Sequence, residues 1–135
     1  MSSAGPDLNS QFRERYRIVN HPAMRRAELQ VIGSNYGATS YTTKEQADRL
    51  AQLLNLTPTT LLLDVGSGAG WPGNYLAATT GCDIVLTDPT LEGMAVATDR
   101  SKRDEIASYA VVARGDALPF TETVFDAATS CDVFC

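Results

Sequence analysis

Apolar and polar positions follow two different patterns along this chain of 135 residues. In residues 1–60 the apolar positions recur three or four apart, as on one face of a helix. From residue 60 onward, short continuous apolar runs alternate with helix-compatible stretches, as in buried parallel strands joined by helices. The sequence therefore predicts a short helical region followed by an α/β unit.

The helical region predicts three helices. The first starts at Asn9 and is amphipathic, with three apolar residues at helical spacing: Phe12, Tyr16 and Val19. The second opens at Pro22, a residue suited to a first helical turn, and runs to Leu29 or Val31. A loop rich in Gly, Ser, Thr and Tyr follows over residues 33–41.

The third helix has the clearest start and stop signals. Thr42 and Thr43 stand three residues before Glu45 and Gln46, the arrangement of a capping box. We expect one apolar face, made by Ala47, Leu50, Leu53 and Leu54. The pair Thr57-Pro58 ends the helix, because proline disfavours a helical conformation in the residue before it.

The α/β unit predicts four strands, at residues 61–65, 83–87, 109–113 and 125–130, separated by helical stretches at 71–81 and 90–107. Such alternation predicts an open, mostly parallel sheet with helices on both faces. In sheets of this kind, ligands bind beyond the carboxyl ends of the strands.

Three sequence signals fall at those carboxyl ends. Residues 64–70, DVGSGAG, form a glycine-rich turn, where the backbone turns tightly and a ligand approaches without meeting a Cβ. Asp88, followed by Pro89, closes the second strand and can accept both hydroxyls of a ribose. Asp116, after the third strand, can accept from an exocyclic amine such as that of adenine. Each signal alone has a structural explanation, as a turn or a helix N-terminal charge, but their order and spacing agree.

A dinucleotide site is the main alternative, because residues 68–73 also match GxGxxG and Asp88 lies 20 residues after Gly68. Three points weigh against an NAD site. The strand does not run directly into the first glycine, the carboxylate of Asp64 would repel a pyrophosphate but suits an ammonium, and Asp116 has no place in that fingerprint.

These residues resemble a known family. LLLDVGSGAG, the acid at Asp88, and GDALPF followed by FDAATS are similar to class I S-adenosylmethionine-dependent methyltransferases, most of all to the type 11 branch of small-molecule enzymes. The resemblance covers residues 42–131. It implies a Rossmann-like, doubly wound α/β sheet, with the strand order 3-2-1-4 in the part that is present.

The resemblance also implies roles at the site. The turn would hold the methionine moiety with Asp64 near its ammonium group, Asp88 the ribose, and Asp116 with Ala117 the adenine. Ser130 or Cys131 would lie near the carboxylate or methyl end, and Tyr36 or Tyr41 could belong to a lid or to a surface loop. The implied cofactor contacts are Asp64, Gly66, Ser67, Gly68, Gly70, Asp88, Pro89, Asp116, Ala117 and Ser130. Because methyl transfer from a sulfonium depends mainly on positioning, no catalytic residue is assigned.

The family domain has seven strands in the order 3-2-1-4-5-7-6, so we expect the last three to be missing here. Residues 1–41 would be a leader with short helices and a lid-like loop, and residues 42–135 an incomplete methyltransferase domain. Two functions stay open: a methyltransferase, or part of one, acting on a small molecule or lipid, and a catalytically inactive cofactor-binding module. In the second case, a partner chain or second copy would pair with the exposed fourth strand.

Charge is distributed unevenly. Residues 1–60 hold seven Lys and Arg against five Asp and Glu, and residues 61–135 hold four against eleven. The acidic half argues against a nucleic-acid partner. The early arginines, at positions 13, 15, 17, 25 and 26, fit either a solvated helix face or contact with an acidic substrate or lipid headgroup.

The sequence also bears on cellular location and metal binding. No apolar run approaches the about 18–20 residues of a membrane-spanning helix, and no export signal is visible, which favours the cytoplasm. The cysteines, Cys82, Cys131 and Cys135, have no CxxC spacing, so we expect reduced thiols and no metal site. The only histidine, His21, is expected to be structural or exposed.

Overall fold

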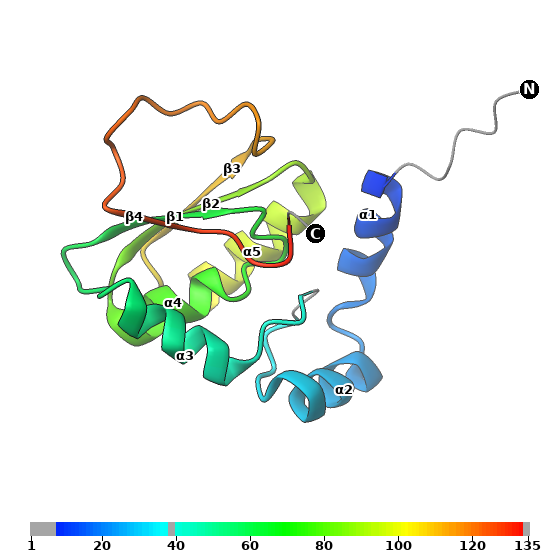
Figure 1. Cartoon of the computed structure of the whole chain (residues 1–135). Helices are drawn as coiled ribbons and strands as arrows, with labels where there is room; N and C mark the ends of the chain where they lie inside the picture. The colour runs from blue at the N-terminus through cyan, green and yellow to red at the C-terminus, as the bar shows by residue number, and fades with distance from the viewer. Residues whose placement is uncertain (1–7, 38–39, 134–135) are drawn as a thin grey trace, which may run out of the picture.

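The computed structural model describes residues 8–37 and 40–133. Three helices are followed by strands that alternate with helices (Figure 1). In chain order the elements are α1 (Leu8–Ile18), α2 (Pro22–Ile32), α3 (Lys44–Leu53), β1 (Leu61–Val65), α4 (Gly73–Thr80), β2 (Asp83–Asp88), α5 (Leu91–Arg103), β3 (Ser108–Val112) and β4 (Ala127–Thr129). Every predicted element is present, with β4 shorter than expected.

The four strands form one parallel sheet in the order β3-β2-β1-β4, which confirms the predicted order. Leu62 of β1 pairs with Ile84 of β2, and both side chains are fully buried. Leu86, two residues further along β2, is fully buried as well. The central strands are thus the core of the unit, as their continuous apolar runs require.

Helices α3, α4 and α5 lie together on one face of the sheet (Figure 1). The opposite face is crossed by residues 113–126, which contain no helix. In that segment Phe120 and Phe125 pack edge to face, with ring centroids 5.0 Å apart. The expectation of helices on both faces is therefore met on one face only in the described residues.

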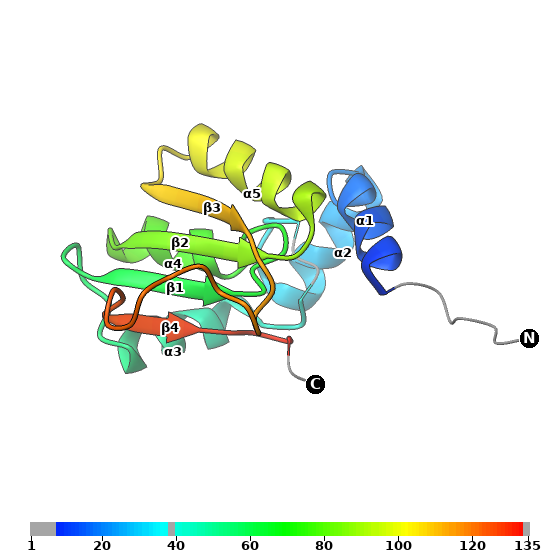
Figure 2. The ribbon, with the colours of Figure 1, turned by 90° about the horizontal axis from the view of Figure 1, so that it is seen from above.

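The N-terminal helices α1 and α2 lie beyond the end of the sheet toward which the strands run (Figure 2). Tyr16 and Val19 of the predicted apolar face are buried there, and α1 packs on α5. The carboxyl ends of the strands, where ligands are expected, are thereby covered by α1 and α2, which carry the early arginines.

Local signals fix the helix starts. Thr43 caps α3 through the predicted capping box with Gln46, and the Nδ1 atom of His21 caps α2 by accepting from the backbone N–H of Ala23 at 3.2 Å. The structural role expected for His21 is thus confirmed. Helix α3 ends at Leu53, before the predicted Thr57-Pro58 stop, and Leu53 is 64% exposed rather than in the core.

Among the helices of the described part, none has both the length and the apolar character needed to cross a membrane.

Candidate functional site

The glycine-rich turn after β1 is fastened to β2. The backbone N–H groups of Gly66 and Ser67 both donate to the carbonyl of Thr87, at 2.8 and 2.9 Å. Gly66, Gly68 and Gly70 have φ angles of 72°, 52° and 91°, in the left-handed region that other residues rarely adopt. The glycines are therefore required by the path of the turn itself.

Asp88 joins this turn to the end of β2. Its Oδ2 accepts from the backbone N–H of Gly68 at 3.0 Å, and its Oδ1 accepts from the backbone N–H of Thr90 at 2.9 Å and from the Thr90 hydroxyl. The Asp88 side chain is buried, with 6% exposed. Two signals 20 residues apart in the sequence thus meet in one hydrogen-bonded unit.

A cavity of about 400 Å³ opens at this point, and we call it the strand-end cavity. It is formed by the turn after β1, the end of β2, the segment after β4 and the N-terminal region. Its lining is Phe12, Tyr16, Ser40, Trp71 and residues 66–68, 88–90 and 131–133. Five of the predicted contacts line it, namely Gly66, Ser67, Gly68, Asp88 and Pro89.

Asp64 does not line this cavity. Its side chain is 1% exposed and lies under the start of α4, and its Oδ2 has no hydrogen-bond partner among the described residues. Burial raises the pKa of Asp64 to about 8, the backbone N–H of Gly73 opposes this rise, and the nearby charge of Asp88 adds to it. Asp64 is thus outside the cavity lining, and its expected contact with an ammonium group stays a prediction.

Gly70 also lies away from the cavity lining. Its N–H donates to the carbonyl of Ser67 at 2.8 Å, and its carbonyl accepts from the N–H of Asn74 at 2.7 Å. Gly70 thus forms the junction between the turn and α4, and its predicted role as a cofactor contact remains a prediction.

The remaining predicted contacts, Ser130, Asp116 and Ala117, are not part of the cavity lining. The hydroxyl of Ser130 donates to the carbonyl of Val65 at 3.0 Å, which joins the segment after β4 to β1. Asp116 forms an exposed ion pair with Arg114 at 2.6 Å, and Ala117 is exposed. Pro89 connects the strand-end cavity to a neighbouring hollow that is also lined by Arg114. The adenine contacts of Asp116 and Ala117 therefore stay predictions.

Aromatic side chains are the part of the lining that sequence reasoning did not assign to the site. Phe12 and Tyr16 were predicted only as a helix face, and Trp71 only as a helix start. Trp71 is 3% exposed, and its Nε1 donates to the carbonyl of Thr42 at 2.8 Å. No spacing rule links α1 to the end of the sheet, because that proximity exists only in the folded chain.

Asp132 was also missed. Its Oδ2 accepts from the Ser40 hydroxyl, from the backbone N–H of Tyr41 at 2.8 Å, and from the N–H and hydroxyl of Thr42, both at 3.2 Å. The hydroxyl of Ser40 is the main cause that lowers the pKa of Asp132, and other donors of this group add to it. Asp132 therefore ties residues 40–42 to the segment that follows β4.

The two tyrosines of the loop have different positions. Tyr36 packs against Trp71, with ring centroids 5.5 Å apart, and its hydroxyl donates to Asp104 at 3.4 Å. Burial first, and then the charge of Asp104, raise the pKa of Tyr36 to about 12. Tyr36 is thus a packing residue, whereas Tyr41 is 83% exposed and lies outside the strand-end cavity.

Metal ligands are not assembled here. Among residues 8–37 and 40–133, no group of three or more His, Cys, Asp and Glu side chains could hold a metal ion. Cys82 and Cys131 are free thiols, the first buried and the second partly buried, and Cys135 lies outside the described residues.

Comparison with known proteins places this geometry in a family. Residues 63–135 match a family model described as Methyltransferase domain. Two curated proteins of Botryococcus braunii are similar: botryococcene C-methyltransferase, 36% identical over 91 residues, and squalene methyltransferase 1, 35% identical over 89 residues. Each match covers 64% of this chain and 24% of the relative, so the chain matches about a quarter of their length.

Solved structures agree on the fold. A SAM-dependent methyltransferase from Geobacter sulfurreducens in complex with S-adenosyl-L-homocysteine has a TM-score of 0.58 and 24% identity, over 77% of this chain and 42% of that one. One from Aquifex aeolicus has a TM-score of 0.62 and 15% identity, over 87% and 55%. At these identities the likeness shows the fold alone. The division of the chain into a leader, residues 1–41, and a methyltransferase domain, residues 42–135, stays a prediction.

Proposed function

This chain belongs to the class I methyltransferases of type 11, and from that premise we propose that it binds S-adenosylmethionine in the strand-end cavity and methylates a small molecule. The observation that carries the proposal is the pairing of Asp88 with the backbone of Gly68 on one wall of that cavity. A dinucleotide site has no support from the family match.

The lining fits this cofactor by its chemistry. A carboxylate retains acceptor capacity beyond the bonds that Asp88 makes within the protein, so it can also accept from ribose hydroxyls. The turn over residues 66–68 lines the cavity, and its glycines at 66 and 68 carry no side chain. A ligand can therefore approach the turn closely there.

When bound, S-adenosylmethionine supplies a methyl group on a positively charged sulfur that is already an activated leaving group. What the protein contributes is position and exclusion of water. Phe12 and Tyr16 close the cavity on the side of α1, and Trp71 closes it on the side of α4. Asp88 would hold the ribose end of the cofactor, and the other lining residues would position its reacting end.

The acceptor class is supported by the named relatives. Botryococcene and squalene, the compounds in their names, are apolar, and α1 and α2 expose several large apolar side chains near the site. We therefore propose an acceptor with a large apolar part.

Calorimetric titration with S-adenosylhomocysteine tests the cofactor assignment. Because hydrogen bonds to a charged group contribute about 1.5–3 kcal/mol, we expect Asp88→Ala to weaken binding about tenfold to a hundredfold. Asp83→Ala, an exposed carboxylate at the other end of β2, is the matched control and should bind as the wild type does.

Asp88→Ala also removes the acceptor of Gly68 and Thr90, so circular dichroism must show that the variant is folded. If it is not, Asp88→Asn keeps one acceptor oxygen and serves as the second variant. Binding of NAD in place of S-adenosylhomocysteine, or unchanged affinity in both folded Asp88 variants, would overturn the assignment.

A further inference from the structure

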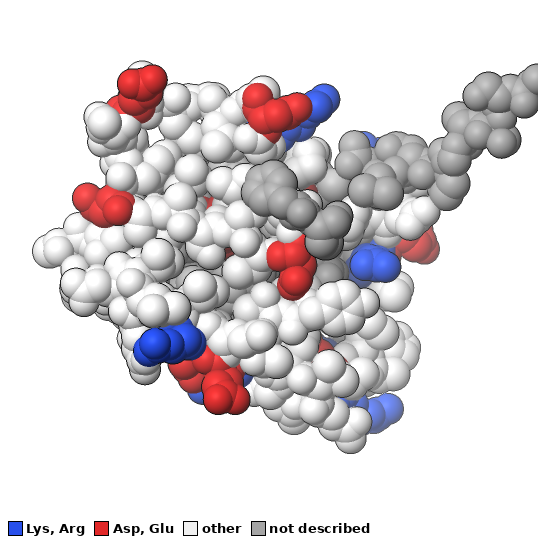
Figure 3. All heavy atoms as spheres, viewed as in Figure 1, with Lys and Arg blue, Asp and Glu red and all other residues white. Residues whose placement is uncertain are grey.

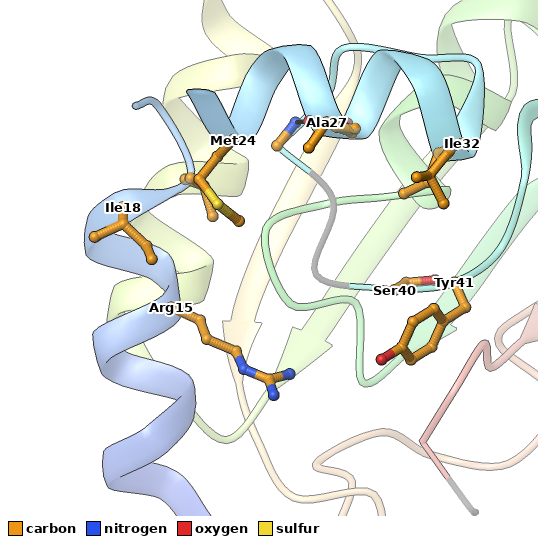
Figure 4. Close-up of a pocket in the computed structure, with 11 residues that line it drawn as sticks. Arg15, Ile18, Met24, Ala27, Ile32, Ser40 and Tyr41 are labelled. Carbon is orange, nitrogen blue, oxygen red and sulfur yellow. Dashed lines mark hydrogen bonds between the residues drawn. The ribbon is translucent and has the colours of Figure 1, made fainter. Parts of the chain in front are cut away.

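A second cavity of about 430 Å³ lies between α1, α2 and the chain around Tyr41, and we call it the helix cavity. This volume is within the about 300–1,000 Å³ of ordinary small-molecule sites. Ile18 and Met24 line it from the junction of α1 and α2, and Ile32 lines it from the far end of α2 (Figure 4). Ile18 and Met24 are 44% and 45% exposed, so apolar surface is open to a ligand.

The helix cavity adjoins the strand-end cavity. Ser40 lines both, and α1 contributes residues to both linings. Phe12 and Tyr16 of α1 line the strand-end cavity, whereas Arg15, Ile18 and Val19 line the helix cavity. A molecule in the helix cavity therefore lies next to the place assigned to the methyl donor.

The acidic residue in the helix cavity is already engaged. Glu28 is 8% exposed, and its two carboxylate oxygens accept from the backbone N–H groups of Tyr36 and Gly37, at 2.5 and 2.6 Å. These bonds hold the start of the loop against α2. Glu28 is thus a structural acceptor with little surface left for a ligand.

Arg15 is different. Its side chain extends from α1 into the space facing Tyr41 (Figure 4). Its guanidinium lies 5.5 Å from the ring centroid of Phe12, and it forms no ion pair with an acidic residue of the described part. Two other arginines of α1 do pair, Arg13 with Glu92 at 3.6 Å and Arg17 with Glu14 at 3.7 Å.

The position of Arg15 relates it to both cavities. Phe12, against which its guanidinium lies, belongs to the strand-end cavity, and Arg15 itself belongs to the helix cavity. The cation therefore lies near the junction of the two. Charged side chains on the face seen in Figure 3 are scattered and of both signs, so no extended basic patch on that face competes with this single cation.

We propose that the helix cavity binds the methyl acceptor, and that this acceptor has an apolar body and an anionic group that pairs with Arg15. The apolar body would lie among Ile18, Met24 and Ile32, and the anionic group near the junction. This inference rests on the proposed function, because it takes the strand-end cavity as the cofactor site. The sequence left two interpretations for the early arginines, a solvated helix face or contact with an acidic substrate. For Arg15 the inference favours contact with an acidic substrate.

Calorimetric titration of the full chain with decanoate and with decanol tests the charge preference. We expect saturable binding of decanoate at one site, and at least about tenfold weaker binding in Arg15→Gln, since one charge-assisted hydrogen bond is lost. Decanol should bind Arg15→Gln and the wild type equally. The matched control is Arg17→Gln, which removes a cation of the same helix that lies outside the cavity.

The apolar body is tested by Met24→Asp, which should weaken both probes by placing a carboxylate among apolar groups. Equal affinity of the wild type for decanoate and decanol would overturn the proposal that the acceptor carries an anionic group. So would an equal effect of Arg15→Gln and Arg17→Gln on decanoate binding. If neither probe binds while S-adenosylhomocysteine does, the helix cavity assignment is wrong and the proposed function stands. If decanoate binds but S-adenosylhomocysteine does not, the proposed function fails, and the acceptor assignment fails with it.

Discussion

The carboxyl group of Asp64 lies directly against the backbone of Gly73, so that the end of β1 packs on the first residue of α4 with no side chain between them. Leu86 and Ile84 of β2 complete the contact. A Cβ placed on Gly73 would come within 2.8 Å of the Cδ2 of Leu86 and 3.0 Å of the Cδ1 of Ile84, as well as meeting Asp64. Gly73 is thus required by close approach of two elements rather than by its backbone conformation.

Replacement of Gly73 by alanine should therefore destabilise the protein. Alanine favours a helix over glycine by up to about 1 kcal/mol, but forcing a methyl group into a filled core costs about 1–3 kcal/mol. We expect a net loss in the free energy of unfolding, measured by urea denaturation. Gly115→Ala is the control, because Gly115 is exposed, and it should change stability by less than about 0.5 kcal/mol. Equal stability of the two variants would contradict the packing described here.

The same carboxyl group predicts a pH dependence of stability. Its pKa is raised by burial to about 8 in the folded protein, against about 3.9 in an unfolded chain. Between these values the folded state holds a proton that the unfolded state has lost, so stability falls as pH rises, by at most about 1.4 kcal/mol per pH unit. The stabilisation is complete below pH about 4 and is lost as pH passes the folded pKa of about 8.

Urea denaturation between pH 5 and 8 measures this slope, and Asp64→Asn should flatten it. The amide is uncharged at every pH and nearly equal in size, so it keeps the packing while removing the titration. Asp83→Asn, an exposed carboxylate on β2, should leave the slope unchanged. A slope that persists in Asp64→Asn would show that another group is responsible.

Most of the fold follows from local pattern. The apolar runs at β1 and β2 predicted buried strands, and the two candidate capping boxes, at Thr42 and Thr43, placed the start of α3 to within one residue. The end of α3 was less well predicted. The sequence signal was the proline at residue 58, but the helix ends at Leu53, whose side chain points away from the core.

The candidate site was predictable where neighbouring strands bring residues together. Asp88 and the glycine turn lie at the ends of adjacent parallel strands, so their proximity follows from the strand order. The depth of a side chain is set by packing. Asp64, one residue from the end of β1, faces the buried helix side, and the sequence pattern does not distinguish that side from the cavity side. The contribution of Phe12 and Tyr16 of α1 to the cavity lining was not predicted either, because the sequence does not show that α1 lies near the end of the sheet.

Removing the Asp132 carboxylate should loosen residues 40–42. The backbone N–H groups of Tyr41 and Thr42 donate to it, so Asp132→Ala should speed their amide hydrogen exchange by about tenfold. Asp126→Ala is the matched control, because Asp126 accepts from Leu61 at 2.8 Å and its loss should speed exchange only at the start of β1. Unchanged exchange at Tyr41 in Asp132→Ala would refute this role.

The lowered pKa of Asp132 gives a second measurement on the same contact. Because its folded pKa lies below that of an unfolded aspartate, the contact contributes stability above the unfolded value of about 3.9 and loses it as pH falls through the folded value. Protection of Tyr41 should therefore decline in acid, and this decline should be absent in Asp132→Ala.

Trp71 should report cofactor binding by its fluorescence. It is the only tryptophan of the chain, it is 3% exposed, and it lines the strand-end cavity but not the helix cavity. S-adenosylhomocysteine should therefore change its emission, because a ligand placed against the indole alters its surroundings. Decanoate should leave the emission nearly unchanged, since Trp71 does not line the helix cavity, its proposed site.

The two variants that separate these sites are Asp88→Ala and Arg15→Gln. The first should shift the response of Trp71 to about tenfold to a hundredfold higher concentrations of S-adenosylhomocysteine and leave decanoate binding intact. The second should weaken decanoate binding and leave the response to S-adenosylhomocysteine unchanged. Because Trp71 also donates to the carbonyl of Thr42, its emission before ligand is added should match the wild type in both variants, which shows that the surrounding fold is unchanged. If decanoate alters Trp71 emission as strongly as S-adenosylhomocysteine does, then the two ligands occupy the same cavity, and the assignment of the acceptor to the helix cavity is wrong.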